Sequence, residues 1–228
     1  MPDSDNDLAA RFAEFAAEFH AESGSKETIE LVTDSARAAL GCADAGVLLR
    51  SGRTVTTASA TSRRVEISDE IQREAAEGPC YAATMTAELY RVDDTTLETP
   101  WPEWAYEVSK LGIRSALGVP LRTHDRHYGA LNLYSELPMG FSDDDVAVAT
   151  IFARHAALAL DAARKEETLE EAIDARKVIG QAQGIIMERY NVDADAAFAT
   201  LTRFSQNNNV KLRNLAEHIV HHREFPGK

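Results

Sequence analysis

The pattern of apolar positions begins with two helical stretches. Four apolar residues recur at spacings of four, three and four: Leu8, Phe12, Phe15 and Phe19. This spacing predicts a helix over 8–22 with one apolar face, so we expect residues 1–24 to form an N-terminal helix ahead of the main domain. A second helical stretch over 25–40 ends before Gly41, a residue type that is common just after a helix.

The period then changes to one that is typical of strands. Five segments rich in β-branched, aromatic or alternating apolar residues follow: 47–50, 54–60, 89–92, 115–122 and 128–134. Short helices are expected over 68–77 and 104–111, the first of them stopped by Gly78-Pro79. About five strands with helices at both ends predict an α/β or α+β domain over 25–163 with a mostly antiparallel sheet.

A long helix is predicted next. Ser142 and Asp145 have the spacing of a capping box, and no Gly follows until Gly180. A helix from 143 to 190 would be about 70 Å long, which favours a long connecting helix or coiled coil. Residues on alternating spacings of three and four suggest a dimer seam: Leu169, Ala172, Arg176, Ile179, Gln183 and Ile186.

The C-terminal part reads as a small helical module over 164–222, with a tail at 223–228. Asn191 or Asp193 can cap a helix whose inward residues are expected to be Ala196, Ala197, Leu201 and Phe204. After the break at Asn207-Asn208-Asn209, Asn209 is expected to cap a last helix with Leu212, Leu215, Ala216, Ile219 and Val220 inside.

Charge separates residues 176–223, the later part of this module, from the remainder of the chain. The 228 residues carry a net charge of −13, which argues against attraction of the whole chain to nucleic acid or anionic membrane. Residues 176–223 alone have a net charge of +3. Two cysteines lack the spacing of a disulfide framework or metal site, and the acidic start MPDSDND is unlike a signal peptide. The apolar run 146–163 is interrupted by charged residues, so we expect a cytoplasmic protein that does not span a membrane.

The module then resembles a known family. The stretch IGQAQGIIM at 179–187, followed by Ala196-x-Phe198, Ser205-Gln206 and KLxxLA from Lys211, is similar to the ANTAR domain of transcription antitermination regulators. The resemblance implies a dimer that binds paired stem-loops in nascent mRNA and so prevents termination. Many members of that family have Lys at the position of Gln183.

The candidate RNA contacts are polar or basic residues on the predicted helices and at the breaks between them. Cations would contact phosphates, and amides and hydroxyls would contact loop bases. The set is Arg176, Lys177, Gln181, Gln183, Arg189, Ser205, Gln206, Asn209, Lys211 and Arg213. Each could equally be a solvated surface residue. Gly180 and Gly184, four apart, either let RNA approach or let helices pack closely, and close packing is the preferred interpretation.

The preceding domain, 25–163, resembles a GAF sensory domain. The resemblance rests on Glu77-Gly78-Pro79-Cys80, the Trp101-Pro102 loop, GIRS at 112–115, GALNLYS at 129–135 and Phe141-Ser142-Asp143. It implies a small-molecule effector of unknown identity. Cys80, Trp101 and Trp104 are candidate ligand-sensing residues, although each could simply belong to the core.

No catalytic motif is recognisable, and we expect no enzyme. The three histidines His218, His221 and His222 lack a suitable further ligand, so no metal site is expected. The sequence therefore predicts a signal-responsive, dimeric RNA-binding antiterminator. The alternative is a ligand- or redox-sensing dimeric protein-interaction module that does not bind RNA.

Overall fold

The computed structural model describes residues 25–98 and 100–226. The predicted N-terminal helix, over 8–22, lies outside the described residues. By contacts between Cα atoms, the chain divides into two compact units, Met1–Arg164 and Lys165–Lys228.

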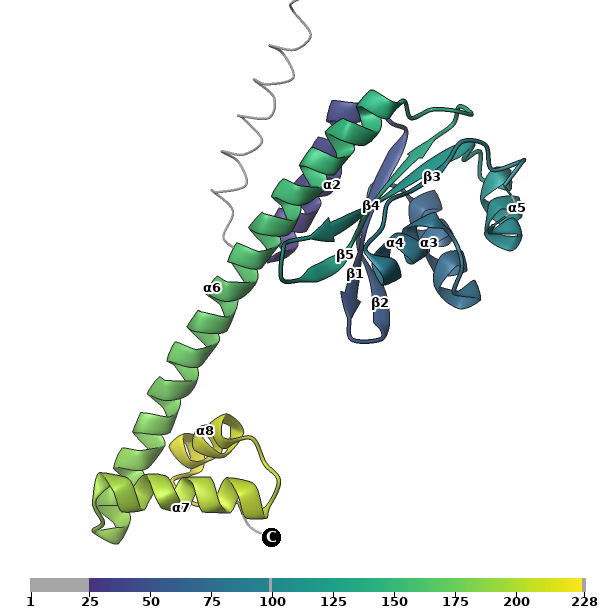
Figure 1. Ribbon diagram of the computed structural model, residues 1–228. Helices are drawn as coiled ribbons and strands as arrows, with labels where there is room; N and C mark the ends of the chain where they lie inside the picture. Colours follow the sequence, from purple (N-terminus) through teal and green to yellow (C-terminus); the bar gives the residue numbers. More distant parts are fainter. Residues whose placement is uncertain (1–24, 99, 227–228) are drawn as a thin grey trace, which may run out of the picture. The chain divides into compact units, whose positions relative to one another are not determined.

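The first unit is built on one antiparallel sheet. Its strands are β1 (Asp44–Ser51), β2 (Thr54–Ala60), β3 (Tyr90–Val92), β4 (Ser115–Arg122) and β5 (His127–Ser135). They lie in the order β2-β1-β5-β4-β3, and every neighbouring pair is antiparallel (Figure 1). The five predicted strands are therefore confirmed, with small differences at their ends.

Helices cover both faces of this sheet (Figure 1). One layer contains α2 (Ser25–Leu40) and the first part of α6 (Asp143–Tyr190), and the other contains α3 (Arg63–Ala75), α4 (Pro79–Thr86) and α5 (Pro102–Lys110). Because side chains alternate along a strand, Leu133 packs in the core on the α6 side, and its neighbour Tyr134 packs on the α5 side. The sheet thus separates two apolar cores.

The region around Gly78 differs from the prediction. The predicted helix over 68–77 begins earlier, at Arg63, and a further helix, α4, follows where only a stop was expected. Gly78 has φ +117°, a conformation that favours glycine, and Pro79 is the first residue of α4. Proline is well tolerated there because the first backbone N–H groups of a helix have no intrahelical partner. Gly78-Pro79 therefore starts α4, whereas α3 has already ended at Ala75, with Ala76 as its C-cap.

Helix α6 begins as predicted. Ser142 Oγ accepts a hydrogen bond from the Asp145 backbone N–H at 3.2 Å, and Asp145 Oδ2 accepts one from the Ser142 backbone N–H at 2.8 Å. By length and composition, α6 is the one helix in the described part of the chain that is apolar enough to cross a membrane. Its first part, however, supplies Phe152, Ala156 and Leu160 to the core against the sheet, and the core helix of a soluble protein passes the same test.

The second unit packs the end of α6 against α7 (Ala194–Asn207) and α8 (Leu212–His222). Its buried residues are Ala182, Ile186, Ala197, Leu201, Leu215, Ala216 and Ile219. Asp193 caps α7 by accepting a hydrogen bond from the Ala196 backbone N–H at 2.8 Å.

Two predictions about the second unit were wrong. Ala196 is exposed, because consecutive helical residues point about 100° apart and Ala197 takes the inward position, and Asn209 does not cap α8. Asn209 has φ +50°, and the N-cap is Lys211, without a side-chain hydrogen bond.

Candidate functional site

Most of the predicted RNA contacts are exposed on the helical unit. Arg176, Lys177 and Gln181 lie on α6, Gln206 lies near the end of α7, and Lys211 lies at the start of α8, all exposed to solvent. Asn209 is also exposed, in the α7–α8 turn. Arg213 is half exposed and donates from Nε to Glu217 Oε1 at 3.0 Å, which partly neutralises it. These side chains are free to contact a large ligand.

Three predicted contacts hold the unit together. Gln183 Nε2 donates to the backbone carbonyl of Ala194 at 2.7 Å and so joins α6 to the start of α7. Ser205 Oγ donates to the carbonyl of Val210 at 2.6 Å across the α7–α8 turn. Arg189 Nη1 donates to the carbonyl of Arg223, just after α8. The polar atoms of these side chains already have intramolecular partners, which gives each a structural role whether or not it also meets RNA.

Gly180 and Gly184 do not pack against α7 or α8. Both glycines are exposed, and a Cβ atom built on either one would have no other atom within 4 Å. The preferred interpretation, close packing inside the module, is therefore wrong for the single chain. No side chain projects from α6 at these two residues, and we call this exposed surface the glycine strip.

Only part of the predicted dimer seam on α6 is open to a second copy of the chain. Ile186 is 2% exposed in the core of the unit, Ile179 packs against the same core, and Gln183 is bonded to Ala194. The seam is therefore wrong from Ile179 onward, because α7 and α8 occupy that face of α6. Leu169 and Ile173 remain 62% and 58% exposed, which is high for apolar side chains of their size.

The first unit contains a buried polar network between the sheet and α3. At its centre, the carboxylate of Asp69 accepts hydrogen bonds from Thr57 Oγ1 at 3.0 Å, Asn132 Nδ2 at 3.1 Å and Tyr134 OH at 3.3 Å. The Tyr134 hydroxyl also lies 3.4 Å from Cys80 Sγ. All of these groups except Thr57 are fully buried. A network of this kind stabilises one arrangement only when its members stay paired.

Burial sets the protonation of this network. It raises the pKa of Asp69 to about 7, although the hydrogen bonds from Thr57, Tyr134 and Asn132 act in the opposite direction. Burial also raises the pKa of the Cys80 thiol to about 12 and the pKa of Tyr134 well above its usual value. Cys80 is thus a thiol near neutral pH, without the thiolate character of a reactive cysteine.

The two tryptophans of the candidate ligand set lie in different surroundings. Trp104 is fully buried, and its Nε1 donates to Ser68 Oγ at 3.1 Å, beside the Asp69 network. Trp101 is only half-buried and meets Tyr90 edge to face, with ring centroids 5.5 Å apart. The structure therefore brings Cys80 and Trp104 into one buried polar cluster, whereas Trp101 is partly exposed to solvent.

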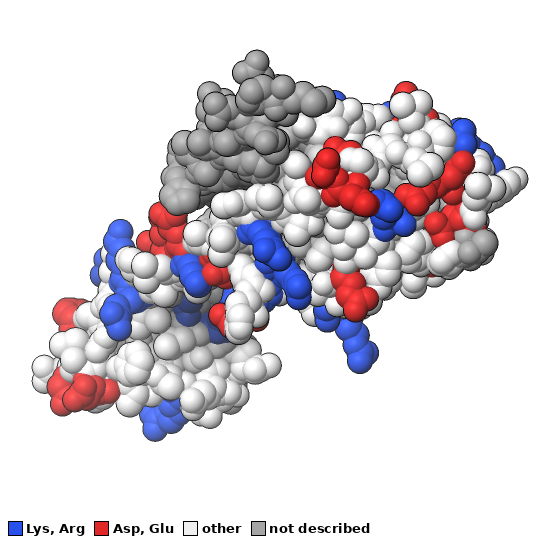
Figure 2. All heavy atoms as spheres, turned by 45° about the horizontal axis from the view of Figure 1, so that its top comes forward, with Lys and Arg blue, Asp and Glu red and all other residues white. Residues whose placement is uncertain are grey.

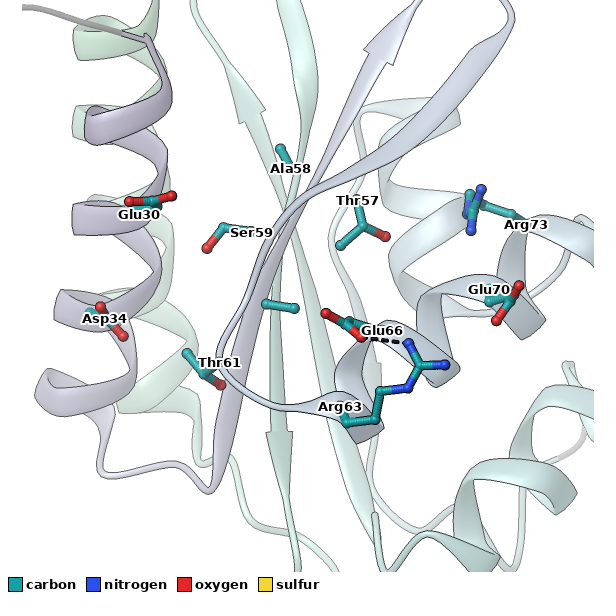
Figure 3. A pocket seen from close by; sticks show the side chains of 11 residues that line it. Glu30, Asp34, Thr57, Ala58, Ser59, Thr61, Arg63, Glu66, Glu70 and Arg73 are labelled. Atoms are coloured by element: carbon teal, nitrogen blue, oxygen red, sulfur yellow. Dashed lines mark hydrogen bonds and ion pairs between the residues drawn. The ribbon is translucent and has the colours of Figure 1, made fainter.

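A groove of about 610 Å³ runs along the edge strand β2 (Figure 3). Glu30 and Asp34 of α2 line one side, and four charged residues of α3 line the other: Arg63, Glu66, Glu70 and Arg73. Arg63 and Glu66 pair at 2.6 Å. Thr57 lies in the floor, and its hydroxyl donates to the buried Asp69. The interior network therefore reaches the lining of this groove through Thr57.

The sequence predictions did not include Arg203 or Asp69. Arg203 on α7 is exposed but was outside the predicted set, and its cationic type beside the other cations was the available signal. Asp69 gave no signal, because an acidic residue in a predicted amphipathic helix is normally solvated.

His218 and His222 stack with ring centroids 4.4 Å apart, and the described residues contain no group of three His, Cys, Asp or Glu that could hold a metal.

Comparison with protein families assigns both units. Residues 22–161 match the GAF domain family, and residues 167–220 match the ANTAR domain family. The chain therefore belongs to the GAF family, and it has the domain order of a GAF-ANTAR regulator. ANTAR domains mark RNA-binding antitermination regulators, GAF domains are sensory, and both are regulatory domains typical of soluble cytoplasmic regulators.

Solved structures confirm the GAF fold. A domain of a two-component sensor histidine kinase protein from Sinorhizobium meliloti is 24% identical, covers 64% of this chain and 97% of its own, and has a TM-score of 0.53. The GAF domain of a phosphoenolpyruvate-protein phosphotransferase from Coxiella burnetii is 15% identical, covers 71% of this chain and 96% of its own, and has a TM-score of 0.57. The free methionine-R-sulfoxide reductase from Neisseria meningitidis is 17% identical, covers 69% of this chain and 90% of its own, and has a TM-score of 0.54. No curated protein matches the chain.

Proposed function

We propose that this protein is a cytoplasmic, non-catalytic antiterminator that binds paired stem-loops in nascent mRNA as a homodimer, in response to a signal received by its GAF domain. The observation that carries the proposal is the ANTAR match over 167–220 on a unit with exposed cations. Within that unit, residues 176–223 carry a net charge of +3, whereas the whole chain carries −13. On the face that Figure 2 shows, acidic and basic side chains lie in separate small groups.

The proposed RNA-binding residues fall into three groups. Arg176, Lys177 and Lys211 would contact phosphates, because their charges are exposed. Gln181, Gln206 and Asn209 would contact bases in the loops through their amide groups. Gln183, Ser205 and Arg189 would support the contact surface through the intramolecular bonds described above. Gln183 already has a structural role, so a Lys at this position is not required for the fold of the unit.

Salt dependence tests the RNA contacts. The affinity of the full chain for a leader RNA with two hairpins should fall with rising salt on a log–log plot. Replacing Lys211 with Ala should lower that slope by about 0.7 if it contacts a phosphate in a single-stranded region. Arg213→Ala should have a smaller effect, because Glu217 already pairs with Arg213. Arg53→Ala, in the β1–β2 turn of the GAF domain, is the control and should leave the slope unchanged.

A negative result would favour the alternative function. If the full chain binds no hairpin RNA at low salt, and no RNA co-purifies with it, the protein is a sensor whose helical unit only dimerises. Native mass spectrometry of the same sample would then reveal any small molecule that the GAF domain retains.

A further inference from the structure

Strand β4 has an edge that its neighbour β3 covers only in part. β3 pairs with Ala116–Gly118 of β4, so the last residues of β4, from Val119 to Arg122, have no strand on that side. The turn Thr86–Leu89 and helix α6 lie beside this uncovered edge instead. The short length of β3, visible in Figure 1, thus leaves a groove within the GAF domain.

The groove consists of two adjoining hollows that share Arg122 and Arg154. Their volumes are about 490 Å³ and 480 Å³. The first hollow also contains the Thr86–Leu89 turn, Pro120 and Thr150, and the second contains Thr123, His124 and Leu158. These volumes lie in the range of about 300–1,000 Å³ that is usual for small-molecule sites.

The two arginines are available for an anion. Both are exposed, and in the described part of the chain neither forms an ion pair or a hydrogen bond. Three other arginines of the domain, Arg64, Arg91 and Arg114, instead pair with carboxylates. Two unpaired guanidinium groups that line the same hollows form a suitable pair of donors for a carboxylate or phosphate.

Apolar walls stand next to these charges. Leu158 is 58% exposed, Leu89 is 37% exposed, and Pro120 lines the first hollow two residues before Arg122 on β4. Among the described residues that line the groove, the one acid is Glu88, which accepts a hydrogen bond from the Tyr90 hydroxyl at 3.3 Å. A bare inorganic anion would leave the apolar walls unused, and a purely apolar molecule would leave the arginines unpaired.

We propose that this groove binds a small organic anion, whose carboxylate or phosphate group is held by Arg122 and Arg154 and whose apolar body packs on Leu89, Pro120 and Leu158. The proposal rests on the signal-receiving role proposed for the GAF domain and names the ligand class. Its test measures binding alone, so it can fail while RNA binding succeeds, and the reverse.

Calorimetric titration of the full chain tests the ligand class. The probes are octanoate and octyl phosphate, with acetate, inorganic phosphate and octylamine for comparison. One of the two long-chain anions should bind at one site per chain, at least tenfold more tightly than its short counterpart, because several methylenes are buried. The stronger of the two identifies the acid group. Octylamine should not bind.

Variants then locate the site. Arg122→Gln and Arg154→Gln should each weaken long-chain anion binding about tenfold or more, through loss of a charge-assisted hydrogen bond. Leu158→Asn should weaken octanoate binding but leave acetate binding unchanged. Arg53→Gln is the matched control, an exposed arginine outside the groove, and it should bind as the unchanged protein does. Circular dichroism checks that each variant is folded.

Four results would overturn the proposal. They are the absence of saturable binding by either long-chain anion, equal binding of octylamine, unaltered affinity in both arginine variants, and a change of oligomeric state in Arg154→Gln without a change in anion binding. The last result would make the groove a contact between two copies of the chain.

Discussion

Asp69 is the centre of the buried polar network in the GAF domain. Its carboxyl group is fully buried, accepts hydrogen bonds from two strands, and is connected to the surface groove through the Thr57 hydroxyl. Its pKa of about 7 means that the folded protein holds this proton over a pH range in which an unfolded chain has released it. Asp69 therefore couples the stability of the domain to pH.

The sign of this coupling follows from the raised pKa. Below about pH 4, both the folded and the unfolded states keep the proton, and Asp69 contributes no pH dependence. Between about pH 4 and pH 7 only the folded state keeps it, so the free energy of unfolding falls as the pH rises, by at most about 1.4 kcal/mol per pH unit. Above the folded-state pKa of about 7 the contribution levels off.

We predict that Asp69→Asn reduces this fall, because an amide has no proton to release. Denaturant unfolding followed by tryptophan fluorescence measures it, since both tryptophans lie in the GAF domain. The control is Asp34→Asn, an exposed carboxylate on α2, which should keep the dependence of the unchanged protein. Identical pH profiles for Asp69→Asn and the unchanged protein would refute the role assigned to Asp69.

At the scale of elements, α6 presents different faces to different partners. One face of its last part is buried against α7 and α8, and another carries Gly180 and Gly184 in open space. Glycine costs about 1 kcal/mol relative to Ala in the middle of a helix. An unpacked glycine therefore destabilises α6 without a compensating contact in the single chain.

Gly180→Ala and Gly184→Ala should each stabilise the helical unit by about 1 kcal/mol, because the new methyl group meets no atom. Thermal unfolding followed by circular dichroism measures this change. Gly118→Ala is the contrasting control, since its Cβ would lie 2.8 Å from the Pro79 carbonyl oxygen and should destabilise the GAF domain. A loss of RNA binding in the two stabilised variants would show that the glycine strip is a contact surface. If both variants destabilise the protein, the strip packs against something outside the single chain.

At the scale of the whole molecule, the exposed apolar side chains of α6 bear on self-association. Leu169 and Ile173 are four residues apart and share a helix face, and both are more than half exposed. α7 and α8 cover one face of the last part of α6, so a dimer contact formed by α6 itself would use the stretch around Leu169 and Ile173 and the glycine strip.

We predict that Leu169→Asn combined with Ile173→Asn raises the dimer dissociation constant at least tenfold, because two large apolar side chains would lose their burial. Analytical ultracentrifugation over a range of concentrations measures it. RNA affinity should fall in parallel, since one dimer is proposed to bind two hairpins. Leu97→Asn, at a 77% exposed position in the GAF domain, should leave the dimer intact. An unchanged dimer in the double variant would place the contact elsewhere.

The sequence by itself determined the five strands, the long helix and the two domain families. These features depend on local signals: alternation along strands, the Ser142–Asp145 capping box, and motif residues at fixed spacing. It missed α4, because Gly78-Pro79 is compatible both with the end of one helix and with the start of another.

The tertiary structure decided which side chains are free. Gln183 was a predicted RNA contact and part of a predicted seam, yet it bonds to Ala194, which is eleven residues away in the sequence. Gly180 and Gly184 were expected to pack and are open, while Asp69 was unremarkable in the sequence and is buried. Contacts of this kind depend on how α7 folds back on α6 and how α3 lies on the sheet. Residue spacing within a single helix contains no information about either arrangement.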